Sequence, residues 1–244
     1  MINHIELQEI PNPETHQKEV IDIHNDFQPE VYIRKGFIRK VYGILFGQLA
    51  LSLMFISIGI LFKESVMKFV IGHPVIMYIT IIAVSITSLL LGTVKTLART
   101  VPINYVLLLI FTVSESYLLM YVAAYYKTDI VFAALAITVA CTLGLTIYAW
   151  TTKKDFTPCY AWMWGFSFIL IVSGLLFFCF GMKYKIFYCG CGVLIYSIYI
   201  ISDTQLILGK FQVEYNTEDY IFVAIKIYFD IINLFLYILR TFGK

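Results

Sequence analysis

Residues 220–239 read YIFVAIKIYFDIINLFLYIL, a run of 20 residues whose only charged members are Lys226 and Asp230. At about 1.5 Å per residue, a helix of this length crosses the hydrocarbon core of a membrane, which is about 30 Å thick. Lys226, Asp230, Asn233 and Tyr237 follow one another at spacings of 4, 3 and 4 residues and therefore share one helix face. The stretch predicts a transmembrane helix whose polar face is turned away from lipid.

The composition of the whole chain is that of a membrane protein. Of its 244 residues, 60% are hydrophobic and only 14% are charged, whereas about 25% of a soluble domain is charged. An aromatic content of 17% argues against a disordered or coiled-coil chain. A net charge of +2 gives no reason to expect nucleic-acid binding. We expect an integral membrane protein whose main partner is the lipid bilayer.

Apolar runs of similar length recur along the chain and are separated by short polar breaks. Each is long enough for a transmembrane helix. We therefore expect one all-α integral membrane domain, a single bundle of seven hydrophobic helices with short loops, in residues 33–244. The five cysteines lie inside or beside these runs, which favours packing between helices over disulfides. The runs lie near residues 41–62, 75–94, 104–126, 130–150, 160–180, 186–208 and 220–239.

The N-terminal segment has a different character. Residues 1–32 hold seven acidic residues, one basic residue and three prolines, which predicts a flexible acidic tail. Four basic residues follow within Arg34–Lys40, and this excess of positive charge predicts a cytosolic N-terminus. With seven crossings, Arg240 and Lys244 would lie on the opposite side, against the same rule. A last segment that is re-entrant would remove the conflict and stays open as the alternative.

Four ionisable residues fall inside the expected spans: Glu115, Asp203, Lys226 and Asp230. An ionised side chain at the centre of a membrane helix costs about 3 kcal/mol, so such residues face the bundle interior or a water-filled path. The sixth and seventh runs are joined by a short connection, which predicts antiparallel packing and brings Asp203 and Asp230 near each other. Two carboxylates at low dielectric constant share one proton.

The aspartate pair has two interpretations. If it loses its proton near neutral pH, the pair is a pH sensor that transiently admits Ca²⁺, which prefers carboxylate oxygens. Alternatively, it is a hydrogen-bonded pair that only holds two helices together. Lys226 lies one turn from Asp230, where it could form an ion pair or extend toward the membrane interface. The residue types alone do not decide between these interpretations.

Three segments carry a resemblance to a known family. They are IRKGFIRKVY at 33–42, ISDTQLI at 201–207 and EDYIFVAIKIYFDIINLF at 218–235. Together they resemble the Bax inhibitor-1 superfamily, and within it the lifeguard branch that includes the Golgi anti-apoptotic proteins. With the seven-run layout, the likeness covers about residues 30–243.

The resemblance implies a function. It implies a non-enzymatic membrane protein of the Golgi or endoplasmic reticulum that leaks Ca²⁺, lowers the luminal Ca²⁺ load and inhibits apoptosis. It implies no cofactor, because Ca²⁺ and protons are the ions that the protein handles. Apoptosis regulators, Ca²⁺-channel proteins and further copies of the chain are left open as protein partners. The alternative is a non-conducting membrane adaptor that restrains cell death by binding partner proteins.

The resemblance also implies roles for single residues. The paired aspartates of the family match Asp203 and Asp230, which would form the proton sensor and a transient Ca²⁺ site. In the closed form of a bacterial relative, a base at the end of the second helix pairs with the seventh-helix aspartate. Arg99 matches that latch base best, and Lys95 is second. The acid of the family's third helix matches Glu115, which would line the ion path.

Two further positions complete the expected site. Glu218 matches the family acid that opens the last span and would lie at the pore mouth. Lys226 departs from the family, in which we expect a neutral residue. A cation one turn from Asp230 favours the ionised carboxylate. We therefore expect Lys226 to modulate the pair, so that this sensor responds at more acidic pH than its relatives.

Overall fold

The computed structural model describes residues 13–159, 162, 165–170, 172–174, 185–211 and 215–243, with side chains from Tyr32 onward. Nearly all of these residues are helical, and no strand occurs among them, which confirms the all-α prediction. The described elements are α1 (Pro13–Leu61), α2 (Lys63–Gly72), α3 (Pro74–Thr93), α4 (Lys95–Arg99), α5 (Ile103–Tyr125), α6 (Thr128–Thr151), the 3₁₀ turn η1 (Thr157–Cys159), α8 (Lys185–Leu208) and α9 (Tyr220–Phe242).

Six described helices are long and apolar enough to cross a membrane. They coincide with six of the seven predicted runs. The remaining run, 160–180, lies largely outside the described residues, and its described parts are helical at 165–170 and 172–174. The multi-pass architecture is therefore confirmed, and the seventh crossing stays a prediction. The six candidate spans are Tyr32–Leu61 of α1, α3, α5, α6, α8 and α9.

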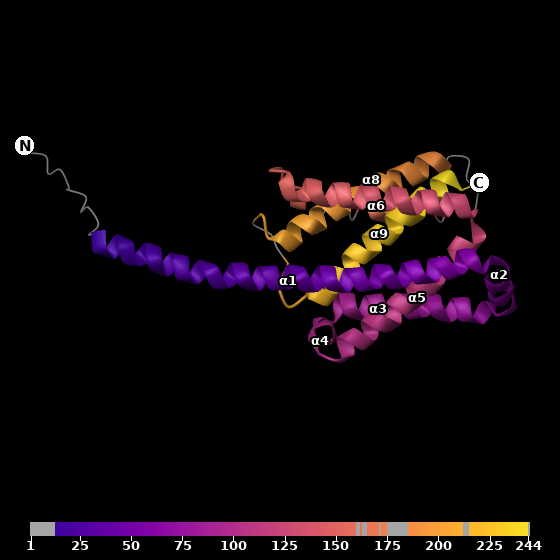
Figure 1. Ribbon diagram of the computed structural model, residues 1–244, viewed down its shortest axis with the longest axis horizontal. Coiled ribbons are helices and arrows are strands. Elements are labelled where there is room, and N and C mark those ends of the chain that lie inside the picture. Colours follow the sequence, from indigo (N-terminus) through magenta and orange to yellow (C-terminus); the bar gives the residue numbers. More distant parts are fainter. Residues whose placement is uncertain are drawn as a thin grey trace, which may run out of the picture.

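The first helix is longer than expected. We predicted a flexible tail over residues 1–32, but α1 begins at Pro13 and continues unbroken to Leu61, so that its first part projects beyond the bundle (Figure 1). Proline is tolerated in the first helical turn, because the amide hydrogen that it lacks has no partner there. Extending a helix that is already nucleated costs little for each added residue. The flexibility of this segment stays a prediction, and residues 1–12 lie outside the described part.

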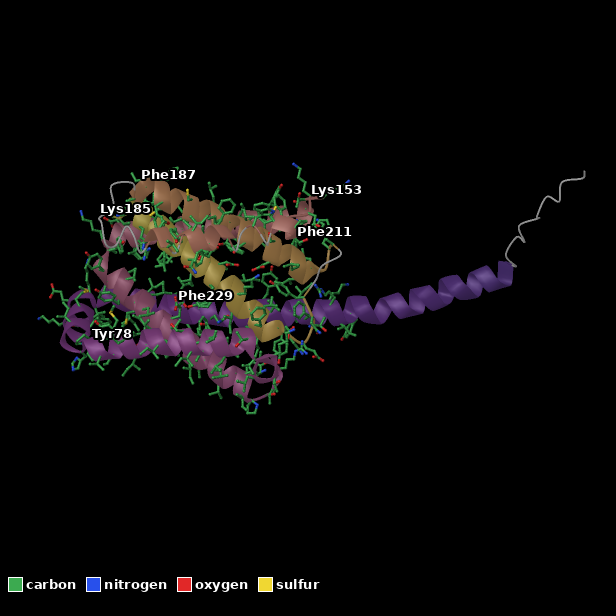
Figure 2. All side chains as sticks on the ribbon, turned by 180° about the vertical axis from the view of Figure 1, so that it is seen from behind. Tyr78, Lys153, Lys185, Phe187, Phe211 and Phe229 are labelled. Atoms are coloured by element: carbon green, nitrogen blue, oxygen red, sulfur yellow. The ribbon has the colours of Figure 1, made fainter. Side chains whose placement is uncertain are left out.

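The helix that is last in the sequence occupies the middle of the fold. α9 packs against α8, α6 and α1. In Figure 2, Phe229 marks the centre of α9, which passes between α6 and α8 on one side and α1, α3 and α5 on the other. Of the residues in its most apolar stretch, 67% are buried, against 17% in α3 and in α6. α9 is one continuous helix of 23 residues, so it contains no re-entrant hairpin.

The outer helices present apolar side chains to their surroundings. On α3, Ile79, Ile82, Ile86 and Leu89 form an exposed stripe at helical spacing. An exposed apolar stripe of this kind is unfavourable in water and is satisfied by lipid. The bundle therefore buries its polar residues around α9 and presents its hydrophobic residues to the bilayer.

Candidate functional site

The two predicted aspartates meet in the interior of the bundle. Asp203 on α8 is 0% exposed and Asp230 on α9 is 5% exposed. Their carboxyl groups lie close enough to interact with each other. Apart from this interaction, Asp203 Oδ2 and Asp230 Oδ2 have no hydrogen-bond partner in the described part of the chain. Two ionised carboxylates repel at low dielectric constant, and a proton shared between them would relieve that repulsion.

Lys226 makes a contact that we did not predict. Its Nζ lies 2.5 Å from Asp203 Oδ1 on the neighbouring helix. The sequence suggested an ion pair with Asp230 or an extended side chain instead. The register of the two antiparallel helices explains the difference. Asp203 is five residues before the end of α8 and Lys226 is six residues after the start of α9, whereas Asp230 lies one turn deeper.

Tyr215, in the connection between α8 and α9, completes the contacts of Asp203. Its hydroxyl donates to Asp203 Oδ1 at 3.0 Å and accepts from Lys226 Nζ at 2.6 Å. The ammonium also lies 5.4 Å from the centre of the tyrosine ring, a cation–π contact. Burial, and then the nearby Asp203 charge, raise the pKa of Tyr215 far above its usual value, so the phenol remains a neutral donor. The sequence analysis missed this residue.

The connection that carries Tyr215 is held by the first helix. Arg34 donates from Nη1 to the Tyr215 carbonyl at 2.7 Å and from Nη2 to the Leu206 carbonyl near the end of α8. Cations are favoured at helix C-termini, where backbone carbonyls lack helical partners. We interpreted the cluster that contains Arg34 as a topology signal only. In the structure, this base also fixes the loop beside the aspartate pair.

Arg99, which we predicted to be the latch base, has different partners from the one expected. It forms a bidentate pair with Asp219, with Nε at 2.7 Å from Oδ1 and Nη2 at 3.0 Å from Oδ2. Its Nη1 lies 2.9 Å from Glu218 Oε2. Asp230 lies 11 residues after Asp219 in the sequence, which is about 16 Å along the helix axis at about 1.5 Å per residue. The structure therefore ties α4 to the start of α9 and does not bring Arg99 to Asp230, while Lys95 is exposed.

Glu115 belongs to a second polar cluster, between α1, α5 and α9. It is buried, at 8% exposed, and the same cluster contains the buried hydroxyl of Tyr228. Ser52 Oγ lies 2.7 Å from that hydroxyl and 3.0 Å from Ser116 Oγ. Ser116, which follows Glu115 in the sequence, thus belongs to a hydroxyl network, and among the described residues no hydrogen bond or ion pair joins Glu115 to either aspartate.

The donor set of the aspartate site is made of oxygens with one competing ammonium. Among the described residues, no group of three or more His, Cys, Asp or Glu side chains gathers in one place. Two carboxylates and a phenol are hard oxygen donors, the ligand type that Ca²⁺ prefers. The arrangement offers chemistry for holding a proton or, transiently, a cation.

Comparison with known proteins identifies the family. Residues 34–244 match the family model described as "Inhibitor of apoptosis-promoting Bax1". The chain is 32% identical to Protein lifeguard 3 of Homo sapiens over 216 residues, which cover 86% of this chain and 69% of the relative. It is 36% identical to the Golgi anti-apoptotic protein of Vaccinia virus (strain Lister) over 212 residues, which cover 86% of each chain. The chain therefore belongs to the anti-apoptotic Bax inhibitor family, in its lifeguard branch.

Proposed function

We propose that this protein is a pH-sensitive Ca²⁺ leak channel of intracellular membranes that lowers the luminal Ca²⁺ load and inhibits apoptosis in that way. The observation that carries the proposal is the burial of two carboxyl groups, Asp203 on α8 and Asp230 on α9, at the interface of two helices that pack together. Membership of an anti-apoptotic family supports the cellular role, and the name of the Vaccinia relative supports a Golgi location.

The proposed sensor works through one proton. With the proton present, the two carboxyls hydrogen-bond across the interface of α8 and α9 and hold these helices together. When the proton leaves, two negative charges face each other at low dielectric constant and repel. Ca²⁺ binds carboxylate oxygens and relieves this repulsion, so a cation can enter where the proton was. Because loss of the proton opens the site, the Ca²⁺ flux rises with pH.

The test is Ca²⁺ flux into liposomes that hold purified protein, scanned from about pH 5 to about pH 8. Asp203→Asn and Asp230→Asn each remove one titrating carboxyl from the pair. Asp129→Asn, at an exposed residue near the start of α6, is the matched control. We expect a flux that rises with pH in the wild type and the control, and a flat pH profile in both site variants.

Each other outcome has a definite meaning. A flux that both site variants leave unchanged contradicts the sensor and leaves the channel. No flux at any pH, from protein with a cooperative unfolding transition, contradicts the channel.

One observation favours a second function, that of a non-conducting adaptor. The first part of α1 projects beyond the bundle and carries five acidic residues within 13–31 (Figure 1). Such a projecting acidic segment can serve as a docking element for partner proteins. Deleting residues 1–31 separates the functions, because a channel keeps its flux and its protection of cells, whereas an adaptor loses its protection.

A further inference from the structure

Lys226 is the cation that the bundle itself supplies to the aspartate site. Its ammonium donates to Asp203 Oδ1 at 2.5 Å and to the Tyr215 hydroxyl at 2.6 Å. Its side chain is only 17% exposed, and Asp203 is fully buried. The ammonium is therefore an integral part of the site, as close to the carboxylate as a bound metal ion would be.

The same distance makes the ammonium a competitor. Ca²⁺ binds carboxylate oxygens at about 2.3–2.6 Å, which is the separation already occupied by Lys226 Nζ. Two cations on one oxygen repel strongly in a buried site. With both aspartates ionised, the positive charge of Lys226 changes the net charge of the cluster from −2 to −1. A divalent ion loses twice as much attraction through this change as a monovalent ion does.

The position of Lys226 also affects how a cation approaches the aspartate pair. Lys226 lies one turn nearer to the start of α9 than Asp230 does, and Tyr215 reaches Asp203 from the connection between α8 and α9. Both side chains therefore contact Asp203 on the side of the pair that is nearer to this connection. Phe211 marks that end in Figure 2. A cation that approaches Asp203 from this end would meet the ammonium at its carboxylate.

We infer that Lys226 is a tethered cation that competes with Ca²⁺ for Asp203 and so lowers the preference of the site for divalent over monovalent ions. The flexible four-carbon stem of a lysine lets the ammonium leave Asp203 without any movement of α9. Ca²⁺ binds when the ammonium has swung away, and the returning ammonium displaces it. This selectivity role rests on the proposed channel function, but the competition for Asp203 does not.

The experiment measures Ca²⁺ binding and ion flux on the same full-length variants. Lys226→Met removes the competing charge, and Lys226→Arg keeps it. Lys153→Met is the matched control, because Lys153 is an exposed lysine at the same end of the bundle (Figure 2). Ca²⁺ binding to protein in detergent is followed by titration calorimetry, and the fluxes of Ca²⁺ and K⁺ are compared in liposomes.

We expect Lys226→Met to bind Ca²⁺ about tenfold more tightly, within the range of couplings that contacting residues give in double-mutant cycles. The ratio of Ca²⁺ to K⁺ flux should rise with it, while Lys226→Arg and Lys153→Met stay close to the wild type. In an Asp203→Asn background, Lys226→Met should have no further effect on binding, because its target is gone.

Unchanged Ca²⁺ affinity in folded Lys226→Met overturns the inference, and so does an increase that persists in the Asp203→Asn background. If Lys226→Met does not fold, Lys226→Gln retains a polar group and takes its place. Absence of flux in every variant contradicts the channel, whereas the binding measurement still decides the competition.

Discussion

Replacing Tyr215 by phenylalanine tests the site with the loss of a single oxygen atom. The Tyr215 hydroxyl donates to Asp203 Oδ1 at 3.0 Å, and such a donor favours the ionised form of the carboxylate. Because the raised pKa of Tyr215 keeps the phenol neutral, its donor is present at every pH at which the channel would be assayed. Without the hydroxyl, the shared proton is held more firmly. The midpoint of the flux profile should therefore move to higher pH.

The size of this shift follows from the strength of the lost hydrogen bond. A hydrogen bond to a charged group contributes about 1.5–3 kcal/mol. One pH unit corresponds to about 1.4 kcal/mol, so the shift is at most about two units. Tyr215 is partly accessible to solvent, and Lys226 remains on Asp203 in the variant, so we expect about one unit.

The assay is the liposome flux measured against pH, with Tyr78→Phe as the matched control. Tyr78 is exposed on α3 and lies at the opposite end of the bundle from Phe211 in Figure 2. The control should keep the midpoint of the wild type. A midpoint that stays in place in folded Tyr215→Phe, or one that moves to lower pH, would refute the assignment of Tyr215 as a donor to the sensor.

Three further changes test the packing and the latch. Gly59→Ala would place a methyl carbon 2.4 Å from a backbone oxygen of α5. Overpacking of this kind should lower the free energy of unfolding by about 1–3 kcal/mol, measured by thermal or denaturant unfolding. The control Gly47→Ala, whose added carbon would have nothing within 4 Å, should not destabilise the protein. Ser52→Ala removes a hydrogen-bond partner from the buried hydroxyls of Ser116 and Tyr228 and should lower the free energy of unfolding by about 1 kcal/mol. The control Ser57→Ala, on the exposed face of α1, should change it little. Arg99→Gln removes the ion pairs between α4 and the start of α9, and these pairs are partly exposed to solvent. Because salt screens exposed ion pairs, the variant should have a lower unfolding temperature than the wild type at low salt but not at high salt. A decrease that is independent of salt would contradict an electrostatic latch.

Hydrophobicity and length were sufficient to predict the six described candidate spans. The run 220–239 coincides with α9 within three residues, because a membrane helix must be apolar over about 20 residues whatever it packs against. The same physical constraint identified Asp203 and Asp230, since a charge inside such a run needs a protected environment. The apolar helix and the buried aspartates both follow from the local sequence and from the membrane environment, so both could be predicted from the sequence alone.

The partners of the charged residues could not be predicted in the same way. Spacing along one helix suggested Asp230 for Lys226, but the register between α8 and α9 brings Asp203 closer. Tyr215 gives no signal in the sequence, because nothing marks a loop tyrosine as inserted toward a buried carboxylate. Arg99 pairs with residues at the start of α9 because the fold places α4 beside that end of the helix. Each of these contacts depends on how two elements meet.

The central place of α9 has a consequence for biosynthesis. α9 is the last of the described helices to leave the ribosome, yet it fills the middle of the bundle. Until it inserts, Asp203 on α8 and Ser52 on α1 lack the partners that α9 provides. At about 5–20 residues per second, the earlier helices wait in the membrane for seconds without these partners. Assembly of this protein therefore ends with its core, and a nascent chain interrupted before α9 is a substrate for membrane quality control.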